Sequence, residues 1–366
     1  MKRFTQAKVK SQSRGFDFWL LTAVLVISAF GLLMVYDASV ASAAQALNDR
    51  YYFIRQQSLW FALGFIGLGF FAFFDYHRLA KLALPSFIAS IGLLFLVFVP
   101  GFGISAYGAH RWLSLPGFTV QPAELVKLTS ILFLATLFQK GARTTPFLII
   151  VGLISFVLAM LQRDLGSTVI FVLISAGIYF IAGAPLKYFL SLVPIVLVGL
   201  LGFILTSGYR RQRVLAFLDP FSDLKGFTYH ISQILIALGS GGLFGLGVGQ
   251  SRQKFSFIPE ITTDSIFAII GEEFGFVGAV TLIILLGIII FRGLTIAVSA
   301  DDQFGKLLAA GLTIWLGAQS VVNLAAMVAL IPLTGVPLPF VSYGGSAILA
   351  NLVAVGILLN ISRNSG

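Results

Sequence analysis

The stretch from Phe274 to Phe291, FGFVGAVTLIILLGIIIF, decides the class of fold, because no charged side chain interrupts it. A helix that crosses the hydrocarbon core of a bilayer needs about 20 predominantly apolar residues. Residues 265–273, which are mostly apolar, extend the stretch toward its N-terminal side. The sequence therefore predicts a transmembrane helix over roughly 265–291.

Similar apolar stretches recur along the whole chain. Hydrophobic residues make up 58% of its 366 residues and charged residues only 10%, whereas soluble domains carry about 25% charged residues. A soluble fold of this length could not bury so much apolar surface in one core, so lipid must be the solvent for much of it. The predicted spans lie at roughly 17–37, 57–75, 82–99, 120–139, 145–161, 165–183, 187–207, 265–291, 306–331 and 340–362. The expected fold class is an all-α polytopic membrane protein with about ten transmembrane helices.

Lysine and arginine set the orientation, because cytoplasmic loops carry an excess of them. With a cytoplasmic N-terminus, the inner side carries Lys2, Arg3, Lys8, Lys10, Arg14, Arg78, Lys81, Lys140, Arg143, Lys187, Arg292, Lys306 and Arg363. The short outer loops carry only Arg50, Arg55, Arg111 and Arg163. We therefore expect a cytoplasmic basic tail over 1–16, one membrane domain over 17–362 and a cytoplasmic end over 363–366. Segment 208–264, between the seventh and eighth helices, is then extracytoplasmic.

The overall charge and the absence of cysteine exclude several classes of site. The formal net charge is +10, but the basic residues lie mostly in the tail and loops, where they meet anionic headgroups. No nucleic-acid partner is therefore expected. The chain has no cysteine, which excludes disulfides and thiolate metal sites. The histidines, His77, His110 and His230, are too far apart in sequence to predict a metal cluster.

The first polar motif is GAHRWL at 108–113, followed by QPAELVK at 121–127. Glu124 and Lys127 are three residues apart, so they share a helix face and can pair. Two interpretations stay open at this point. The pair is a salt bridge that holds two helices together, or it is the charged lining of an outward-facing cavity.

Two further motifs also fall on the outer side. QRDLGS at 162–167 favours a tight turn in which Asp164 caps the next helix. The glycine-rich stretch 239–249 follows no strand and precedes no Gly-Lys-Ser/Thr, which excludes a phosphate loop. Asp264 lies where the chain enters the eighth predicted helix, and both a helix cap and a catalytic base stay open for it. Glu272 and Glu273, farther along that helix, are expected to be in a buried ion pair.

The last motif is PLTGVPLPFVSYGGS at 332–346. Its prolines and glycines break helix geometry, and non-helical backbone at membrane depth must be buried in protein or line a cavity. We expect a cavity lining rather than an ordinary outer turn. Together the motifs predict an outward-facing polar cavity with a basic rim, which suits an anionic substrate.

At these residues the chain resembles the SEDS family, which includes RodA, FtsW and SpoVE. The family motifs recur in the expected order, as GAHRWL, QPAELVK, QRDLGS, the glycine-rich stretch, FIPEITTD at 257–264 and VPLPFVSYGGS at 336–346. The residues SRQK at 251–254 favour the FtsW branch. Arg163 stands where the family usually has proline, so the turn before Asp164 is expected to differ.

The resemblance implies a peptidoglycan glycosyltransferase that polymerises lipid II into β-1,4 glycan strands outside the bacterial cytoplasmic membrane. Asp264 matches the family's essential aspartate, whose expected role is general base. The implied substrate-binding residues are Arg111, Glu124, Lys127, Arg252, Lys254, Ser342 and Ser346. The implied partner is a class B penicillin-binding protein, a single-span transpeptidase. A divalent cation, Mg or Mn, is compatible with this chemistry, but no ligand cluster in the sequence predicts one.

Two other functions compete with this interpretation. Broken helices and buried charges are also typical of transporters, so a lipid II flippase is the first alternative. The one-sided distribution of the polar motifs favours an enzyme, because a transport route also needs polar residues toward the cytoplasm. A noncatalytic scaffold of the cell-wall synthesis machinery is the second alternative, and the sequence does not separate a role in division from one in elongation.

Overall fold

The computed structural model describes residues 15–106, 109–115, 118–185, 187, 202, 208–219, 228–254 and 262–364. The helices before segment 208–264 are α1 (Phe18–Leu47), α2 (Tyr52–Phe73), α3 (Tyr76–Leu96), α4 (Pro122–Phe138), α5 (Thr144–Phe156), the π-helical turn η1 (Val157–Leu161) and α6 (Leu165–Ile181). The later helices are α8 (Gly208–Leu218), α9 (Tyr229–Ser240), α10 (Ile266–Ser299), α11 (Gln303–Met327) and α12 (Gly345–Asn364). The strands are β1 (Gly103–Ala106), β2 (Ala109–Leu115) and β3 (Phe118–Val120).

The helices follow the predicted spans closely. Seven stretches in the described residues are long and apolar enough to cross a membrane, namely Phe18–Val40 of α1, α2, α3, α5 with η1, α10, α11 and α12. α4 and α6 occupy two further predicted positions, but each has only 17 residues, which rise about 26 Å at 1.5 Å per residue. The remaining predicted span, 187–207, lies outside the described residues except for Lys187 and Gly202. The count of ten spans therefore stays a prediction.

Several helix boundaries differ from the prediction. α1 continues ten residues beyond the predicted end at 37, because the small, helix-compatible residues after Asp37 extend it to Leu47, where Asn48 closes it with a φ of 52°. The last helix begins at Gly345 rather than 340, because Phe340 takes a φ of 64° and interrupts helix geometry. Hydropathy detects neither the more polar C-terminal part of α1 nor the later start of α12.

The connection between α3 and α4 is a small antiparallel sheet, which the all-α prediction did not include. β1 pairs with β2 and β2 pairs with β3. Its strands are short, and apolar alternation over so few residues is a weak signal. The sheet positions Arg111, in the middle of β2, near the end of α3 and the start of α4.

Segment 208–264, which the sequence predicts to be extracytoplasmic, also contains regular structure. α8 and α9 lie within it, and the glycine-rich stretch after α9 hydrogen-bonds to the backbone of α10. Gly245 makes this contact possible, because its φ is 82° and a Cβ there would lie 2.1 Å from the Glu273 carbonyl oxygen. α10 bends at the same level, where Gly275 departs from helical geometry with a φ of 68°.

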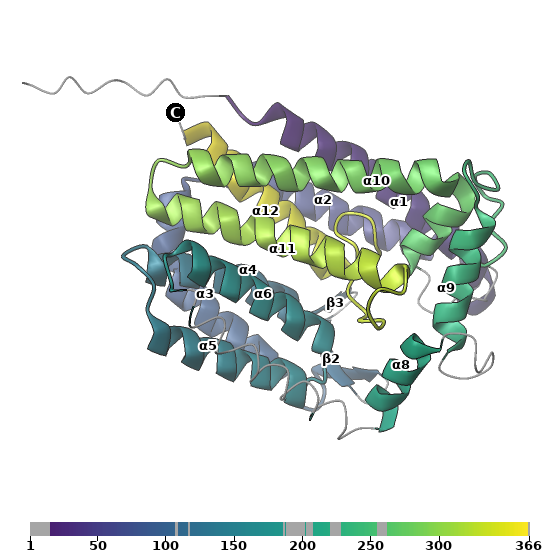
Figure 1. Cartoon of the computed structure of the whole chain (residues 1–366), viewed down its shortest axis with the longest axis horizontal. Coiled ribbons are helices and arrows are strands. Elements are labelled where there is room, and N and C mark those ends of the chain that lie inside the picture. Colours follow the sequence, from purple (N-terminus) through teal and green to yellow (C-terminus); the bar gives the residue numbers. More distant parts are fainter. Residues whose placement is uncertain are drawn as a thin grey trace, which may run out of the picture.

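The polar motifs and the C-terminus lie at opposite ends of the helices (Figure 1). At one end, Asp17 precedes α1 and pairs with Arg292, in the second half of α10, at 2.6 Å. The Asp17 N–H also donates to Ser362, near the end of α12, at 3.3 Å. The other end holds α8, α9 and the strands, together with the starts of α10 and α12. This agrees with the expectation that the motifs share the side opposite the termini.

α12 is the central helix of the described bundle, and 83% of its span is buried. It packs against α2 through glycines, as is common where helices approach closely in membranes. A Cβ at Gly356 would lie 2.5 Å from the Leu68 carbonyl oxygen and 2.9 Å from the Leu68 Cα. The backbone of α2 would have to move to accept any side chain there.

The close contact of Gly356 predicts a stability defect for a single methyl group. We expect Gly356→Ala to lower stability by about 1–3 kcal/mol, because overpacking forces the helices apart. Thermal unfolding of the purified protein in detergent measures the change. Gly69→Ala in α2 is the matched control, since nothing lies within 4 Å of a Cβ there. Equal melting temperatures for the two variants would contradict tight packing of α2 on α12.

Candidate functional site

The proline-rich segment, residues 332–344 between α11 and α12, folds back onto the residues that lead into α10. Asn323, on α11, donates through its Nδ2 atom to the Asp264 carbonyl oxygen and to the Val336 carbonyl oxygen, both at 2.8 Å. The Tyr343 N–H donates to the Thr262 carbonyl oxygen at 2.7 Å. The third and fourth sequence motifs therefore meet at one place.

Asp264 lies at this meeting point, and only 8% of its surface is exposed. The Thr263 hydroxyl donates to its Oδ1 atom at 3.2 Å. Gly335 passes beside its Oδ2 atom, since a Cβ there would lie 3.9 Å away. The N-cap residue of α10 is Ser265, which makes no side-chain capping hydrogen bond. The arrangement therefore favours a site residue over a helix cap.

The start of α4 joins the first, second and fourth motifs. The Gln121 N–H donates to the Ser346 hydroxyl at 2.9 Å, and the Gln121 amide donates to Asp164 at 3.1 Å. Asp164 caps α6 as predicted, since it accepts from the Ser167 N–H at 3.0 Å. A Cβ at Gly166 would lie 2.7 Å from the Thr334 carbonyl oxygen. The beginnings of α4, α6 and α12 thus pack around the proline-rich segment.

The predicted pair of Glu124 and Lys127 is confirmed. Their charged groups lie 2.6 Å apart and both side chains are 1% exposed. The Lys127 ammonium also donates to Gln319 on α11 at 3.2 Å and lies 5.4 Å from the centre of the Trp315 ring. Gln319 in turn donates to the Pro337 carbonyl oxygen at 3.0 Å. The pair therefore connects α4 to the proline-rich segment through α11.

Several buried side-chain oxygen atoms at this end have no hydrogen-bond partner among the described residues, and two of them belong to residues that hold the site together. These two are Oε2 of Glu124 and Oδ1 of Asn323. Buried polar groups are usually satisfied, so each exception calls for an explanation. In each side chain the other polar atom makes contacts within the site. Oε1 of Glu124 accepts from Lys127, and Nδ2 of Asn323 donates to the carbonyl oxygens of Asp264 and Val336. An arriving polar substrate or water can satisfy the two unpartnered oxygens.

Arg111 contacts the turn before Asp164, since its guanidinium donates to the Arg163 carbonyl oxygen. Arg163 has a φ of 56°, which proline cannot adopt because its ring fixes φ near −65°. The expectation that this turn differs from the family's proline-containing form is therefore confirmed. Arg111 is half-buried and lies at the edge of the site.

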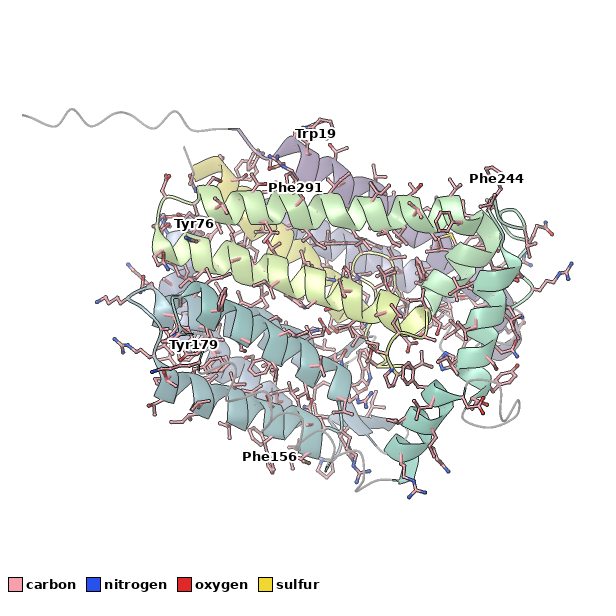
Figure 2. The ribbon with its side chains drawn as sticks, viewed as in Figure 1. Trp19, Tyr76, Phe156, Tyr179, Phe244 and Phe291 are labelled. Atoms are coloured by element: carbon pink, nitrogen blue, oxygen red, sulfur yellow. The ribbon has the colours of Figure 1, made fainter. Side chains whose placement is uncertain are left out.

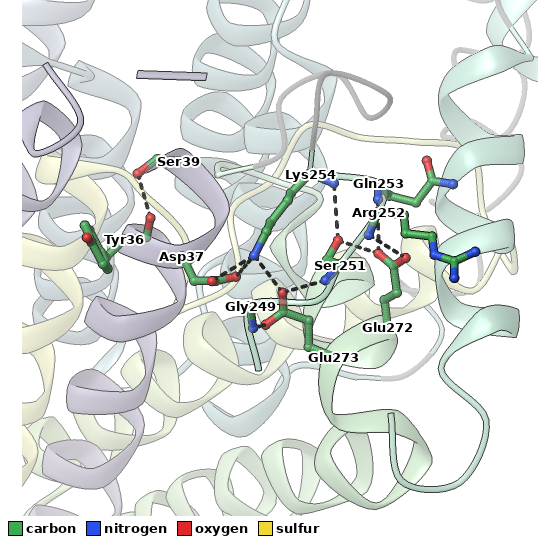
Figure 3. A network of polar contacts seen from close by, with 10 residues as sticks. All are labelled: Tyr36, Asp37, Ser39, Gly249, Ser251, Arg252, Gln253, Lys254, Glu272 and Glu273. Atoms are coloured by element: carbon green, nitrogen blue, oxygen red, sulfur yellow. Dashed lines mark hydrogen bonds and ion pairs between the residues drawn. The ribbon is translucent and has the colours of Figure 1, made fainter. Parts of the chain in front are cut away.

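Lys254 takes part in a separate network (Figure 3). Its ammonium lies 2.9 Å from Asp37 on α1 and 3.0 Å from Glu273 on α10. Glu273 also accepts from the Gly249 and Ser251 N–H groups, each at 3.0 Å. Burial lowers the pKa of the Lys254 ammonium, but hydrogen bonds and charge from the two carboxylates outweigh this, and the net pKa is raised. A buried ion pair was predicted for Glu272 and Glu273, and Glu273 forms one with Lys254.

This network fastens α1, the glycine-rich stretch and α10 to one another. Glu272 contributes by accepting from the Ser251 hydroxyl and from the Arg252 N–H. Because Lys254 is 4% exposed and held by two carboxylates, its position favours a structural role over substrate binding. Arg252, by contrast, is exposed.

The network predicts a large loss of stability when its only lysine is removed. We expect Lys254→Met to destabilise the protein by about 3–5 kcal/mol, because two facing carboxylates lose their common cation in a buried position. Denaturant or thermal unfolding in detergent measures the loss. The neighbouring exposed Arg252→Met is the control and should change stability by less than about 0.5 kcal/mol. A Lys254 variant as stable as this control would contradict the role of Lys254 in holding the network together.

The predicted substrate-binding serines also make internal hydrogen bonds. Ser342 accepts from the Leu338 N–H at 2.8 Å, and Ser346 accepts from Gln121. Both are buried. In this arrangement they shape the proline-rich turn and the start of α12.

Sequence reasoning missed Asn323, Gln319 and Asp37. Each is a polar residue inside an otherwise apolar helix, and such residues are functional candidates in membranes. That signal could have singled them out, although not their partners. In the described part of the chain, no group of three or more histidine, aspartate or glutamate side chains is arranged to hold a metal ion.

The fold and the site define a polytopic membrane protein with a polar, largely buried site at the ends of its helices. Comparison with protein families gives the particular family. Residues 18–366 match the family FTSW_RODA_SPOVE, described as cell cycle proteins. The chain belongs to this family, as the sequence motifs indicated.

Relatives and solved structures cover nearly the whole chain. A probable peptidoglycan glycosyltransferase FtsW from Geobacter sp. (strain M18) is 39% identical over 356 residues, which cover 95% of this chain and 97% of the relative. Stage V sporulation protein E from Bacillus subtilis (strain 168) is 38% identical, with the same coverage. The names of these relatives support the FtsW branch.

Two solved structures share the fold. A chain from a structure described as the coordination of polymerization and crosslinking by a peptidoglycan synthase complex matches with a TM-score of 0.77 and 29% identity. That match covers 96% of this chain and 98% of the other. The rod shape determining protein RodA of Thermus thermophilus matches with a TM-score of 0.69 and 29% identity, over 96% of this chain and 97% of the other.

Proposed function

We propose that this protein is a peptidoglycan glycosyltransferase that polymerises lipid II into β-1,4 glycan strands, with Asp264 as general base. The observation that carries the proposal is the position of Asp264, a nearly buried carboxylate where the proline-rich segment meets the start of α10. The names of the relatives, which match over most of the chain, support the activity. The active site faces outward from the bacterial cytoplasmic membrane.

Asp264 removes the proton from the 4-hydroxyl of the acceptor sugar. The hydroxyl oxygen then attacks the anomeric carbon of the donor, and the bond from that carbon to the polyprenyl diphosphate breaks. The attack from the opposite face inverts the anomeric centre and gives the β-1,4 link. Such a positioned base contributes about 10²–10⁴-fold to the rate.

The site must also hold Asp264 in place and stabilise the leaving diphosphate. Asn323 fixes the backbone of Asp264 to the proline-rich segment. Lys127, through Gln319, fixes the same segment from the other side. The cationic side chains of Arg111 and Arg252 are the best placed to meet the diphosphate, because they are the less buried ones. Fixed cations stabilise the charge that develops as the diphosphate leaves.

The partner in this proposal is a class B penicillin-binding protein that crosslinks the new strands. One structural neighbour is described as a complex that coordinates polymerization and crosslinking. The neighbouring structures also include RodA, so division and elongation are both compatible with the fold.

Purified protein, with its transpeptidase partner, should convert labelled lipid II into glycan strands that a gel resolves. A parallel assay in vesicles measures movement of labelled lipid II between leaflets. Translocation of lipid II without strand formation would show that the protein is a flippase and not a polymerising enzyme. If a folded, partner-bound protein produces no strands and no translocation, the result would favour a noncatalytic scaffold.

A further inference from the structure

A cavity of about 280 Å³ lies at the end of the helices opposite Asp264. We call it the terminal cavity. It is bounded by the residues before and at the start of α1, by the second half of α10 and by the end of α12. The residues that matter for its chemistry are Phe16, Asp17, Trp19, Arg292, Ser299 and Ser362.

The terminal cavity carries a partly exposed cation. The Arg292 guanidinium pairs with Asp17 through its Nε and Nη2 atoms, and 30% of its side chain remains exposed. A second cation lies at the edge, because Arg363 stacks over the Phe16 ring at 5.6 Å and the Phe73 ring at 5.5 Å. With Asp17 as the single anion, these groups sum to a net charge of +1. In the sequence, residues 1–14 contain five basic and no acidic residues.

Exposed apolar side chains surround the terminal cavity. Trp19 is 67% exposed and Phe18 is 70% exposed, and on α10 Phe291 and Val298 are 65% and 81% exposed. Figure 2 shows Trp19 and Phe291 pointing outward from the helices. In a membrane these side chains contact acyl chains, and tryptophan is enriched at the headgroup level. The cavity therefore opens where lipid headgroups meet acyl chains.

We propose that the terminal cavity binds the phosphate headgroup of an anionic phospholipid. Basic pockets between transmembrane helices on the cytoplasmic side bind such headgroups, and nearby basic tails add attraction. Arg292 supplies the charged donors, since part of its guanidinium side chain stays exposed beside Asp17. The acyl chains lie along the exposed face of α10. This site does not depend on the catalytic activity.

The test uses full-length protein in neutral detergent, with thermal unfolding followed as phosphatidylglycerol is added. Asp17→Asn keeps the helix cap, since asparagine caps as well as aspartate, and frees Arg292 from its anion. We expect it to bind phosphatidylglycerol about five-fold more tightly. The double variant Asp17→Asn with Arg292→Gln should lose this gain and bind phosphatidylglycerol more weakly than the wild type. Arg363→Gln alone should weaken binding about five-fold.

Lys81→Gln is the matched control, because Lys81 is exposed near the same end of the bundle but does not line the terminal cavity. It should bind as wild type does. Equal stabilisation by zwitterionic phosphatidylcholine would overturn the proposal, as would weaker binding by Asp17→Asn. Equal stabilisation by inorganic phosphate or glycerol phosphate would reduce the site to one for a soluble anion and would also overturn it.

Discussion

Asp264→Asn is expected to reduce lipid II polymerisation by about 10²–10⁴-fold, the contribution of a positioned general base. Asparagine has nearly the same shape as aspartate, and it can still accept from the Thr263 hydroxyl. It cannot take a proton from the acceptor hydroxyl. Initial rates of strand formation by the purified protein with its partner measure the loss.

The control for this variant is Asp49→Asn, which changes a partly exposed carboxylate in the loop between α1 and α2. It should polymerise at the wild-type rate. Melting temperatures should agree for Asp264→Asn and wild type, since the Asn323 bond goes to the backbone of residue 264 rather than to its side chain. An Asp264→Asn protein that keeps more than about a tenth of the rate would remove Asp264 as the base.

Asp264 was identified as a candidate site residue from its sequence motif, whereas the residues that contact it could not be predicted. Hydropathy located the helix that begins at Ile266, because a bilayer fixes the length of an apolar run. The partner that orients Asp264 is Asn323, 59 residues away along the chain. No local pattern encodes such a pairing, because it depends on how α10, α11 and the proline-rich segment pack.

Lys254 shows the opposite case. Its place in an FtsW-like motif suggested substrate binding, but the packing of α1 against α10 puts Asp37, 217 residues away, beside its ammonium. The pair of Glu124 and Lys127 was predictable because its partners are one helical turn apart. A partner one helical turn away was therefore predictable, whereas partners far apart in the sequence, such as Asp37 and Lys254, were not.

The buried pair of Glu124 and Lys127 predicts the second large effect, on stability. Lys127→Met leaves the Glu124 carboxylate buried with its other oxygen already unpartnered. We expect a loss of about 3–5 kcal/mol, since a buried charge without its partner is strongly destabilising. Glu124→Gln should cost less, because Lys127 keeps the Gln319 oxygen and the Trp315 ring. Unfolding by heat or denaturant in detergent measures both losses.

Combining changes separates the structural role of the pair from a role in substrate binding. Glu124→Gln with Lys127→Met should recover most of the lost stability, because replacing both charges of a buried pair is often neutral. Exchanging the two charges should also recover more than either single reversal, but incompletely, because Gln319 presents an oxygen to position 127. The exposed pair of Asp49 and Arg55 is the control, since reversing it should change stability by at most about 1 kcal/mol. If the neutral double variant folds stably but polymerises slowly, the charges themselves act on the substrate. If neither combination recovers stability, Glu124 and Lys127 do not act as a simple pair.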